Sequence, residues 1–157
     1  QIGDILYASG LTIGTAESCT GGRISEAIIA IPGSSDYYKG GIVAYTDEVK
    51  VKLLGVSSEV LEEQTAVSEE VAREMVLGTL NAIGVDFAIA STGYAGPGGG
   101  TKEAPVGTIW LAYGNREEVR TFKLTEDFGR DINLAIATNK AIRLMLDFLK
   151  DMDIKSE

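Results

Sequence analysis

The stretch TAESCTGG, residues 15–22, places a serine hydroxyl and a cysteine thiol where the sequence predicts a sharp turn. It follows the apolar residues 11–14 and precedes a helical pattern over residues 24–31, so a strand should turn into a helix here. The first N–H groups of a helix lack partners within it, and glycine lets a ligand approach the backbone closely. A hydroxyl such as that of Ser18 beside free N–H groups is typical of a nucleophile next to an oxyanion hole. The alternative is a Ser or Thr that only caps the helix.

The chain contains no histidine, and this excludes several catalytic classes. Ser-His-Asp and Cys-His catalysis are both ruled out. The histidine ligands of most catalytic zinc sites are also missing, and a single cysteine does not replace them. If Ser18 is a nucleophile, its base must therefore be a lysine, a tyrosine or a carboxylate.

Tyr45 and Lys50 form a second group of candidate residues. Tyr45 ends a predicted strand, and Lys50 lies in the first turns of the helix predicted to follow. The positive field of a helix N-terminus and any burial both lower the pKa of a lysine towards a value useful in a general base. Asp47 and Glu48 act in the opposite direction. The alternative is a solvated Lys50 beside a half-buried Tyr45.

The glycine-rich loop TGYAGPGGGT, residues 92–101, invites comparison with phosphate-binding loops. A Walker A loop needs Gly-Lys-Ser/Thr, but Gly100 is followed by Thr101. The dinucleotide fingerprint also fails, because Thr101 occupies its third glycine position and no helical pattern follows. We interpret the loop as one that a ligand can approach closely, since a mere connector does not need three successive glycines.

Two further residues leave their roles open. Cys19 stands beside Ser18, but with no histidine to activate it we expect a small buried cysteine. Arg130, just before the last predicted helix, either binds an anion or caps a surface.

Composition predicts one globular domain over residues 1–157, with 45% hydrophobic residues and a formal net charge of −9. The negative charge argues against a nucleic-acid partner, and no apolar run is long enough to span a membrane. No signal peptide is recognisable, and one cysteine allows no internal disulfide, which suits a cytoplasmic protein. A single anionic small molecule is still compatible with this charge, and we expect a homo-oligomer, a dimer or higher.

The pattern of strands and helices predicts a three-layer α/β/α sandwich. Its mixed sheet should be mostly parallel, with one antiparallel hairpin around residues 114–117. Strands are predicted at residues 11–16, 40–45, 86–91, 106–113 and 118–124. Helices are predicted at residues 2–9, 22–31, about 47–54, 68–83 and about 131–150. A further short helix should start at residue 57 or 58. Ligands bind such sheets where the strand ends carry the loops.

Several motifs taken together are similar to those of the CinA C-terminal domain family, the nicotinamide mononucleotide amidohydrolases. They are TAESCTGG, PGSSDYYKGGIVAYTDEVKVKLLGV, AVSEEVA and STGYAGPGGGTKEAPVGTIWLA, and they recur in order from about Leu11 to Leu149. The resemblance implies hydrolysis of the amide of nicotinamide mononucleotide to nicotinic acid mononucleotide and ammonia, a step of pyridine nucleotide salvage. It therefore implies a small-molecule nucleotide substrate, and neither a cofactor nor a metal.

The resemblance also assigns roles to individual residues. It implies Ser18 as the nucleophile, Tyr45 as an assisting tyrosine and Lys50 as the catalytic lysine. Tyr94 stands where the family more often has an aliphatic residue, and Arg130 lies in Gly-Arg-Asp where the family has Gly-Asp-Arg. The substrate-binding set expected from the two glycine-rich segments and this arginine is Cys19, Thr20, Gly21, Gly22, Thr92, Gly93, Gly96, Gly98, Gly99, Gly100 and Arg130.

The implied mechanism is acyl transfer from the amide to Ser18, with Lys50 as base and backbone N–H groups of residues 19–22 as the oxyanion hole. The alternative function is a non-catalytic nucleotide-binding regulatory module. Retention of Ser18, Tyr45 and Lys50 argues against that alternative, because a binder needs no nucleophile and lysine pair.

Overall fold

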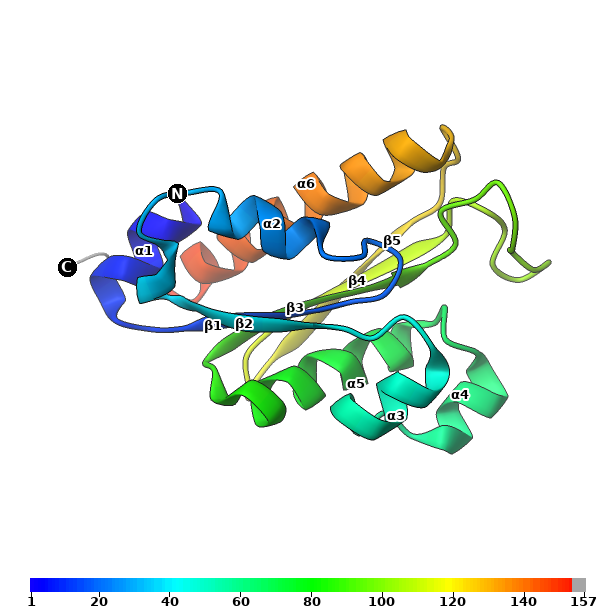
Figure 1. Ribbon diagram of the computed structural model, residues 1–157, viewed down its shortest axis with the longest axis horizontal. Coiled ribbons are helices and arrows are strands. Elements are labelled where there is room, and N and C mark those ends of the chain that lie inside the picture. The colour runs from blue at the N-terminus through cyan, green and yellow to red at the C-terminus, as the bar shows by residue number, and fades with distance from the viewer. Residues whose placement is uncertain (154–157) are drawn as a thin grey trace.

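The computed structural model describes residues 1–153 of the chain as a five-stranded sheet between two layers of helices (Figure 1). The described strands are β1 (Ile13–Glu17), β2 (Tyr38–Val43), β3 (Phe87–Gly93), β4 (Ile109–Gly114) and β5 (Val119–Leu124). The α-helices are α1 (Ile2–Ser9), α2 (Arg23–Ile29), α3 (Asp47–Leu54), α4 (Ser58–Gln64), α5 (Glu69–Thr79) and α6 (Arg130–Asp151). The predicted three-layer α/β/α class is confirmed.

The sheet has the strand order β2-β1-β3-β4-β5. Strands β2, β1 and β3 are parallel, so their carboxyl ends meet at one edge, where Glu17 lies opposite Val43 on one side and Ser91 on the other. Both β3–β4 and β4–β5 are antiparallel. The antiparallel half is therefore larger than the single predicted hairpin, because β4 also returns antiparallel to β3. This register brings the segments after β1, β2 and β3 together.

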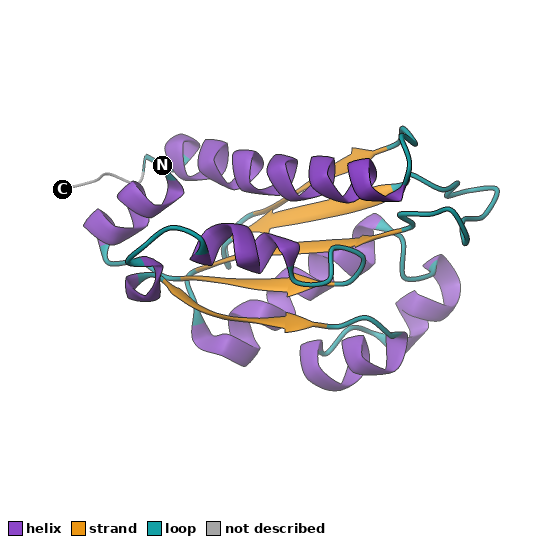
Figure 2. Cartoon of the chain, turned by 45° about the horizontal axis from the view of Figure 1, so that its top comes forward, coloured by secondary structure: helices purple, strands orange, loops and turns teal. Residues whose placement is uncertain are grey.

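The two helical layers each enclose a hydrophobic core against one face of the sheet (Figures 1 and 2). Helices α1, α2 and α6 cover one face and bury residues such as Leu6, Ile24 and Phe148. Helices α3, α4 and α5 cover the other and bury Val71 and Met75 among others. Burying these side chains supplies the main favourable free energy of folding, at roughly 25 cal/mol per Å² of apolar surface.

Three of the described α-helices begin after a Thr or Ser whose side chain caps the first turn. The side chain of Thr46 accepts a hydrogen bond from the Val49 N–H at the start of α3, and Gly55 ends that helix with φ +67°. Ser57 and Ser68 cap α4 and α5 in the same way. The helix after Ser68 differs from the prediction, because its last turn, Leu80–Gly84, is π-helical. Among the described residues, no helix combines the length and apolarity that a membrane span requires.

Candidate active site

A cavity of about 520 Å³ opens at the carboxyl edge of the parallel strands. The loops that follow β1, β2 and β3 all contribute to it, as expected for a sheet of this kind. Ten of the residues expected at the site line this one cavity: Ser18, Cys19, Tyr45, Lys50, Thr92, Gly93, Gly96, Gly98, Gly99 and Arg130. Tyr94, whose role the sequence leaves open, also lines it. Thr20, Gly21, Gly22 and Gly100 are not among its lining residues.

Ser18 and Lys50 meet at this cavity although 32 positions separate them in the chain. Lys50 Nζ lies 3.0 Å from Ser18 Oγ, and the lysine side chain is 1% exposed. Helix α3 starts directly after the turn that leaves β2, and this brings its first turn beside the end of β1. A nucleophile and a base within hydrogen-bond distance form the basic unit of covalent catalysis.

Burial lowers the pKa of Lys50 from its ordinary value of 10.5. Desolvation penalises the charged ammonium and is the largest cause. The negative charge of Asp47 raises the pKa, and Cys19 acts in the same direction, but neither reverses the shift. Of the opposing effects expected from the sequence, burial therefore outweighs the nearby negative charge, and Lys50 loses its proton more easily than an ordinary lysine.

Tyr45 contributes to the cavity differently from the expected assisting role. It lies two residues beyond the end of β2, and its side chain is 64% exposed. Its backbone carbonyl, rather than its phenol, accepts a hydrogen bond from Lys50 Nζ at 3.4 Å. Within residues 1–153, the Tyr45 hydroxyl makes no hydrogen bond to protein, so it is available to a ligand.

The expectation that the first N–H groups of α2 are free for a ligand is wrong. Glu17, the last residue of β1, accepts hydrogen bonds from the N–H groups of Ile24 (2.9 Å) and Ser25 (2.8 Å). The Gly21 N–H donates to the Ser18 carbonyl at 3.2 Å. In the described chain, the turn's remaining N–H groups without a protein acceptor are those of Cys19, Thr20 and Gly22. Of these three residues only Cys19 lines the cavity, so its N–H is the first candidate donor of an oxyanion hole at this turn.

Thr20 also departs from its expected place in the pocket. Its side chain is fully buried and donates to Glu17 Oε1 at 2.6 Å. Its hydroxyl also lies 2.7 Å from Ser91 Oγ. The side chain therefore supports the turn from behind, and the residue itself does not line the cavity.

Cys19 is buried, as predicted, with an exposed fraction of 8%. Burial raises the pKa of its thiol from 9.0 to about 11, and the negative charge of Glu17 contributes in the same direction. A thiol with this pKa is protonated near neutral pH and is a poor nucleophile. The structure therefore favours Ser18 over Cys19 as the attacking group.

The glycine-rich loop after β3 and the start of α6 form another wall of the cavity. Arg130 is the first residue of α6, and its Nη1 donates to the Gly96 carbonyl at 2.7 Å. Gly99 has φ +84°, and its backbone passes over the ring of Tyr94, which a Cβ on Gly99 would approach to 3.1 Å. A guanidinium at the first turn of a helix provides a favourable place for an anion.

One wall of the cavity was not found by sequence reasoning. It comes from the end of α4 and the connection to α5, and consists of Leu61, Thr65, Ala66 and Val67. Thr65 has φ +66° and ψ 169°, a region that almost only glycine adopts. Ser68 Oγ donates to the Thr65 carbonyl and Thr92 Oγ1 to the Ala66 carbonyl, and these bonds hold the segment. The motif AVSEEVA includes Ala66 and Val67, but nothing in its residues indicates that they line a cavity, because this depends on how the segment packs against the end of β3.

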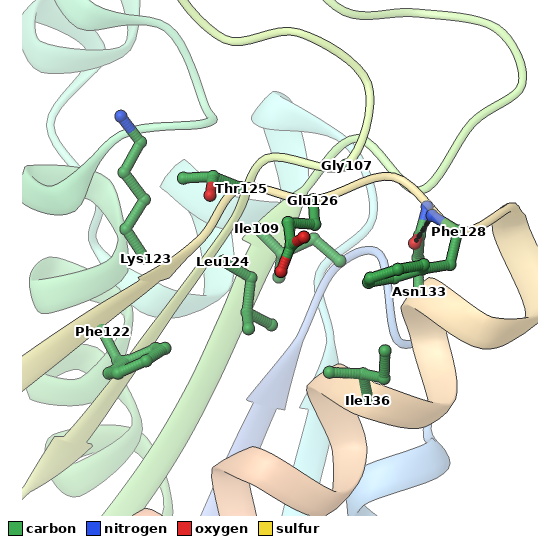
Figure 3. A pocket seen from close by; sticks show the side chains of 10 residues that line it. All are labelled: Gly107, Ile109, Phe122, Lys123, Leu124, Thr125, Glu126, Phe128, Asn133 and Ile136. Atoms are coloured by element: carbon green, nitrogen blue, oxygen red, sulfur yellow. Dashed lines mark hydrogen bonds between the residues drawn. The ribbon is translucent and has the colours of Figure 1, made fainter.

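A second cavity, of about 300 Å³, lies between β5, the segment after it and α6 (Figure 3). Its lining is largely apolar, with Phe122, Leu124, Phe128 and Ile136 among its side chains. Thr125, Glu126 and Lys123 also line it, but within residues 1–153 no hydrogen bond joins the Thr125 hydroxyl to either charged side chain. Residues 1–153 also contain no group of three or more His, Cys, Asp or Glu side chains that could hold a metal ion. The cavity at Ser18 is the candidate active site because it holds the hydrogen-bonded pair of Ser18 and Lys50.

The fold and this site define a three-layer α/β/α protein with a buried serine and lysine pair at the carboxyl edge of a parallel sheet. The profile of the CinA C-terminal domain matches residues 1–149. The chain belongs to the CinA C-terminal domain family.

Relatives and solved structures agree with this assignment. A CinA-like protein of Leptospira borgpetersenii is 44% identical over 93% of the chain, and the match covers 35% of that protein. A CinA superfamily protein from Escherichia coli has a TM-score of 0.86 and 39% identity, covering 90% of this chain and 82% of that one. The competence damage-inducible protein A (ComA) of Klebsiella pneumoniae has a TM-score of 0.91 and 36% identity, with coverages of 95% and 92%. The chain thus spans about a third of the length of the Leptospira relative.

Proposed function

We propose that the chain hydrolyses the amide of nicotinamide mononucleotide to nicotinic acid mononucleotide and ammonia. The observation that carries the proposal is the 3.0 Å contact between Ser18 Oγ and the buried Lys50 Nζ at a cavity of about 520 Å³. A cavity of this size lies in the range that accommodates small-molecule ligands. The resemblance of the sequence motifs to nicotinamide mononucleotide amidohydrolases supplies the substrate. The expected homo-oligomer and the cytoplasmic location stay predictions.

The reaction begins when neutral Lys50 accepts the proton of Ser18 as Oγ attacks the amide carbonyl carbon. The N–H groups of Cys19 and its neighbours in the turn stabilise the negative oxygen of the tetrahedral intermediate. The protonated lysine then gives its proton to the leaving nitrogen, the C–N bond breaks and ammonia departs. Water, deprotonated by the same lysine, hydrolyses the ester on Ser18 and releases the carboxylate product.

The phosphate of the substrate must bind against the overall negative charge of the chain. Arg130 supplies the positive charge at the cavity, and the first turn of α6 adds unpaired N–H groups. The glycine-rich loop allows the ribose and phosphate to approach its backbone. The exposed phenol of Tyr45 is a further contact for the bound nucleotide.

Incubation of the purified protein with nicotinamide mononucleotide tests the proposal. We expect equal amounts of ammonia and nicotinic acid mononucleotide, measured by an ammonia assay and by chromatography. The Ser18→Ala variant is the control and should release neither product. Binding of the mononucleotide without turnover by the wild-type protein would overturn the proposal and favour the nucleotide-binding regulatory module.

A further inference from the structure

The residue directly before Ser18 is a fully buried carboxylate that plays no part in the mechanism above. Glu17 is 0% exposed and accepts four hydrogen bonds. Oε1 accepts from Thr20 Oγ1 (2.6 Å) and from the Ile24 N–H (2.9 Å). Oε2 accepts from the N–H (2.8 Å) and Oγ (2.6 Å) of Ser25. A buried carboxylate with both oxygens satisfied in this way holds its surroundings in one geometry.

Glu17 also sets the direction of two chains of hydroxyl groups. Thr20 gives its only hydroxyl proton to Glu17, so Ser91 must be the donor in its 2.7 Å contact with Thr20. Ser25 likewise gives its hydroxyl proton to Glu17, so Thr15 must be the donor in its 2.7 Å contact with Ser25.

The second chain of hydroxyls extends one step further. Because Thr15 gives its proton to Ser25, the hydroxyl of Tyr38 must donate to Thr15 across 2.9 Å. The carboxylate thus links the two neighbouring strands, through Ser91 and Tyr38, to the start of α2.

We propose that Glu17 is a positioning residue that holds the Ser18 turn in its reactive geometry. It satisfies the two N–H donors at the start of α2 and holds Thr20 from behind, so the turn between them is fixed at both ends. The N–H group of Cys19, which lines the cavity, is left for the oxyanion beside Ser18 Oγ. This inference rests on the proposed role of Ser18 as the nucleophile.

Electrostatics considered alone predicts that removing the negative charge of Glu17 would raise the reaction rate. The negative charge of Glu17 reaches the turn, because it contributes to the raised pKa of Cys19. A negative charge near a developing oxyanion is unfavourable, so its removal would by itself speed up attack by Ser18. If the rate falls when the charge is removed, the cause must therefore be a change in the geometry of the Ser18 turn, because the electrostatic effect would raise the rate.

The test is Glu17→Gln, which keeps the size of the side chain but places an amide NH₂ against donors that need an acceptor. We expect kcat to fall about 100-fold, the scale of a misplaced reacting group, with KM nearly unchanged. The second measurement is sulfonylation of Ser18 by phenylmethylsulfonyl fluoride, followed by mass spectrometry, which should slow in parallel. The matched control is Glu26→Gln, which removes the same charge from an exposed position in the first turn of α2 and should leave both rates unchanged.

Thermal unfolding shows whether each variant is folded at the assay temperature. If Glu17→Gln does not fold, Thr20→Val removes one of the four hydrogen bonds and should lower both rates in the same direction by a smaller factor. A folded Glu17→Gln protein with wild-type or faster kcat and sulfonylation would overturn the inference, as would a wild-type Ser18 that does not react. Slower sulfonylation without any amidase activity in the wild-type protein would instead keep the role of Glu17 and reject the proposed substrate.

Discussion

Two glycine-rich segments border the same cavity, and they are held in different ways. The turn that carries Ser18 is buried and is fixed from behind by the side chains of Glu17 and Thr20. The loop that contains Gly96 and Gly99 projects beyond the sheet (Figure 1) and is exposed over much of its length. One of its few side-chain anchors is the bond from Arg130 to the Gly96 carbonyl.

We infer from this difference that the Ser18 turn serves the chemical step and that the glycine-rich loop serves substrate binding. Chemistry requires reacting groups held within a few tenths of an ångström, and the networked turn provides this. Binding of a flexible nucleotide tolerates a loop that adjusts to the ligand. Low local stability is expected in ligand-binding loops of this kind. Changes in the Ser18 turn and Lys50 should therefore affect kcat, and changes in the loop and Arg130 should affect KM.

The largest effect should come from Ser18→Ala, which removes the nucleophile alone. We expect kcat to fall by about 10⁴-fold or more while binding of the mononucleotide and the thermal unfolding temperature stay close to wild type. The measurement is ammonia release together with calorimetric titration. Cys19→Ala is the matched control from the neighbouring position, and a loss of activity in that variant with an active Ser18→Ala protein would contradict the assignment.

Lys50→Met should reduce kcat by a factor similar to that of Ser18→Ala, since the two residues act as a unit. It should also stabilise the fold, because it replaces a buried amine with an apolar side chain of similar length. Steady-state rates and thermal unfolding measure both effects, and Lys52→Met, an exposed lysine of the same helix, is the control. A double variant much slower than either single variant would show that the two residues act independently.

The pH dependence should report the lowered pKa of Lys50. Only the neutral amine accepts a proton, so kcat/KM should rise with pH through the pKa of Lys50 in the free enzyme, which lies below 10.5. The free energy of unfolding should also rise with pH between that pKa and 10.5, since the unfolded lysine binds the proton more tightly. Lys50→Met should abolish this dependence. A rate that stays flat with pH in the wild-type protein would argue against Lys50 as the base.

Arg130→Ala should act on binding. A charge-assisted hydrogen bond to phosphate contributes roughly 1.5–3 kcal/mol, so KM for the mononucleotide should rise about 10- to 100-fold with a smaller change in kcat. Use of the phosphate-free riboside should be nearly unchanged. Arg143→Ala, which alters an exposed arginine further along α6, is the control. Equal losses on both substrates would mean that Arg130 does not recognise the phosphate.

The smallest effect should come from a pair of substitutions in the glycine-rich loop. Gly99→Ala puts a side chain at φ +84° and close to the Tyr94 ring, at a cost of about 1–2 kcal/mol in local conformation. Gly98→Ala meets open space and lies outside the strained region. We expect KM to rise in the first variant and not in the second. A change in kcat in either variant would contradict the inference that the loop acts on binding and the Ser18 turn on the chemical step.

The sequence predicts the layers and the element order well, because apolar periodicity and the capping residues Thr46, Ser57 and Ser68 are local signals. It also selects Ser18 and Lys50 as candidates once histidine is absent. It does not predict their 3.0 Å contact or the direction of the pKa shift of Lys50, because both depend on packing between β1 and α3.

Two other features were missed for different reasons. Glu17 has a visible signal, an acidic residue at the end of a buried strand with Thr20 three positions later, but its role depends on where α2 starts. The wall around Thr65 was missed because its residue types do not indicate the unusual backbone conformation of Thr65, and because the neighbouring Ala66 carbonyl is held by distant Thr92.

The most direct test of the account is to trap the intermediate on Ser18. The wild-type protein would be mixed with nicotinamide mononucleotide, quenched in acid within one turnover and digested for mass spectrometry. The account predicts an ester of the nucleotide's acyl group on the peptide that contains Ser18, formed together with the first equivalent of ammonia and absent from Ser18→Ala. Ammonia release at the wild-type rate from Ser18→Ala, or an acyl group on Cys19 instead, would contradict it.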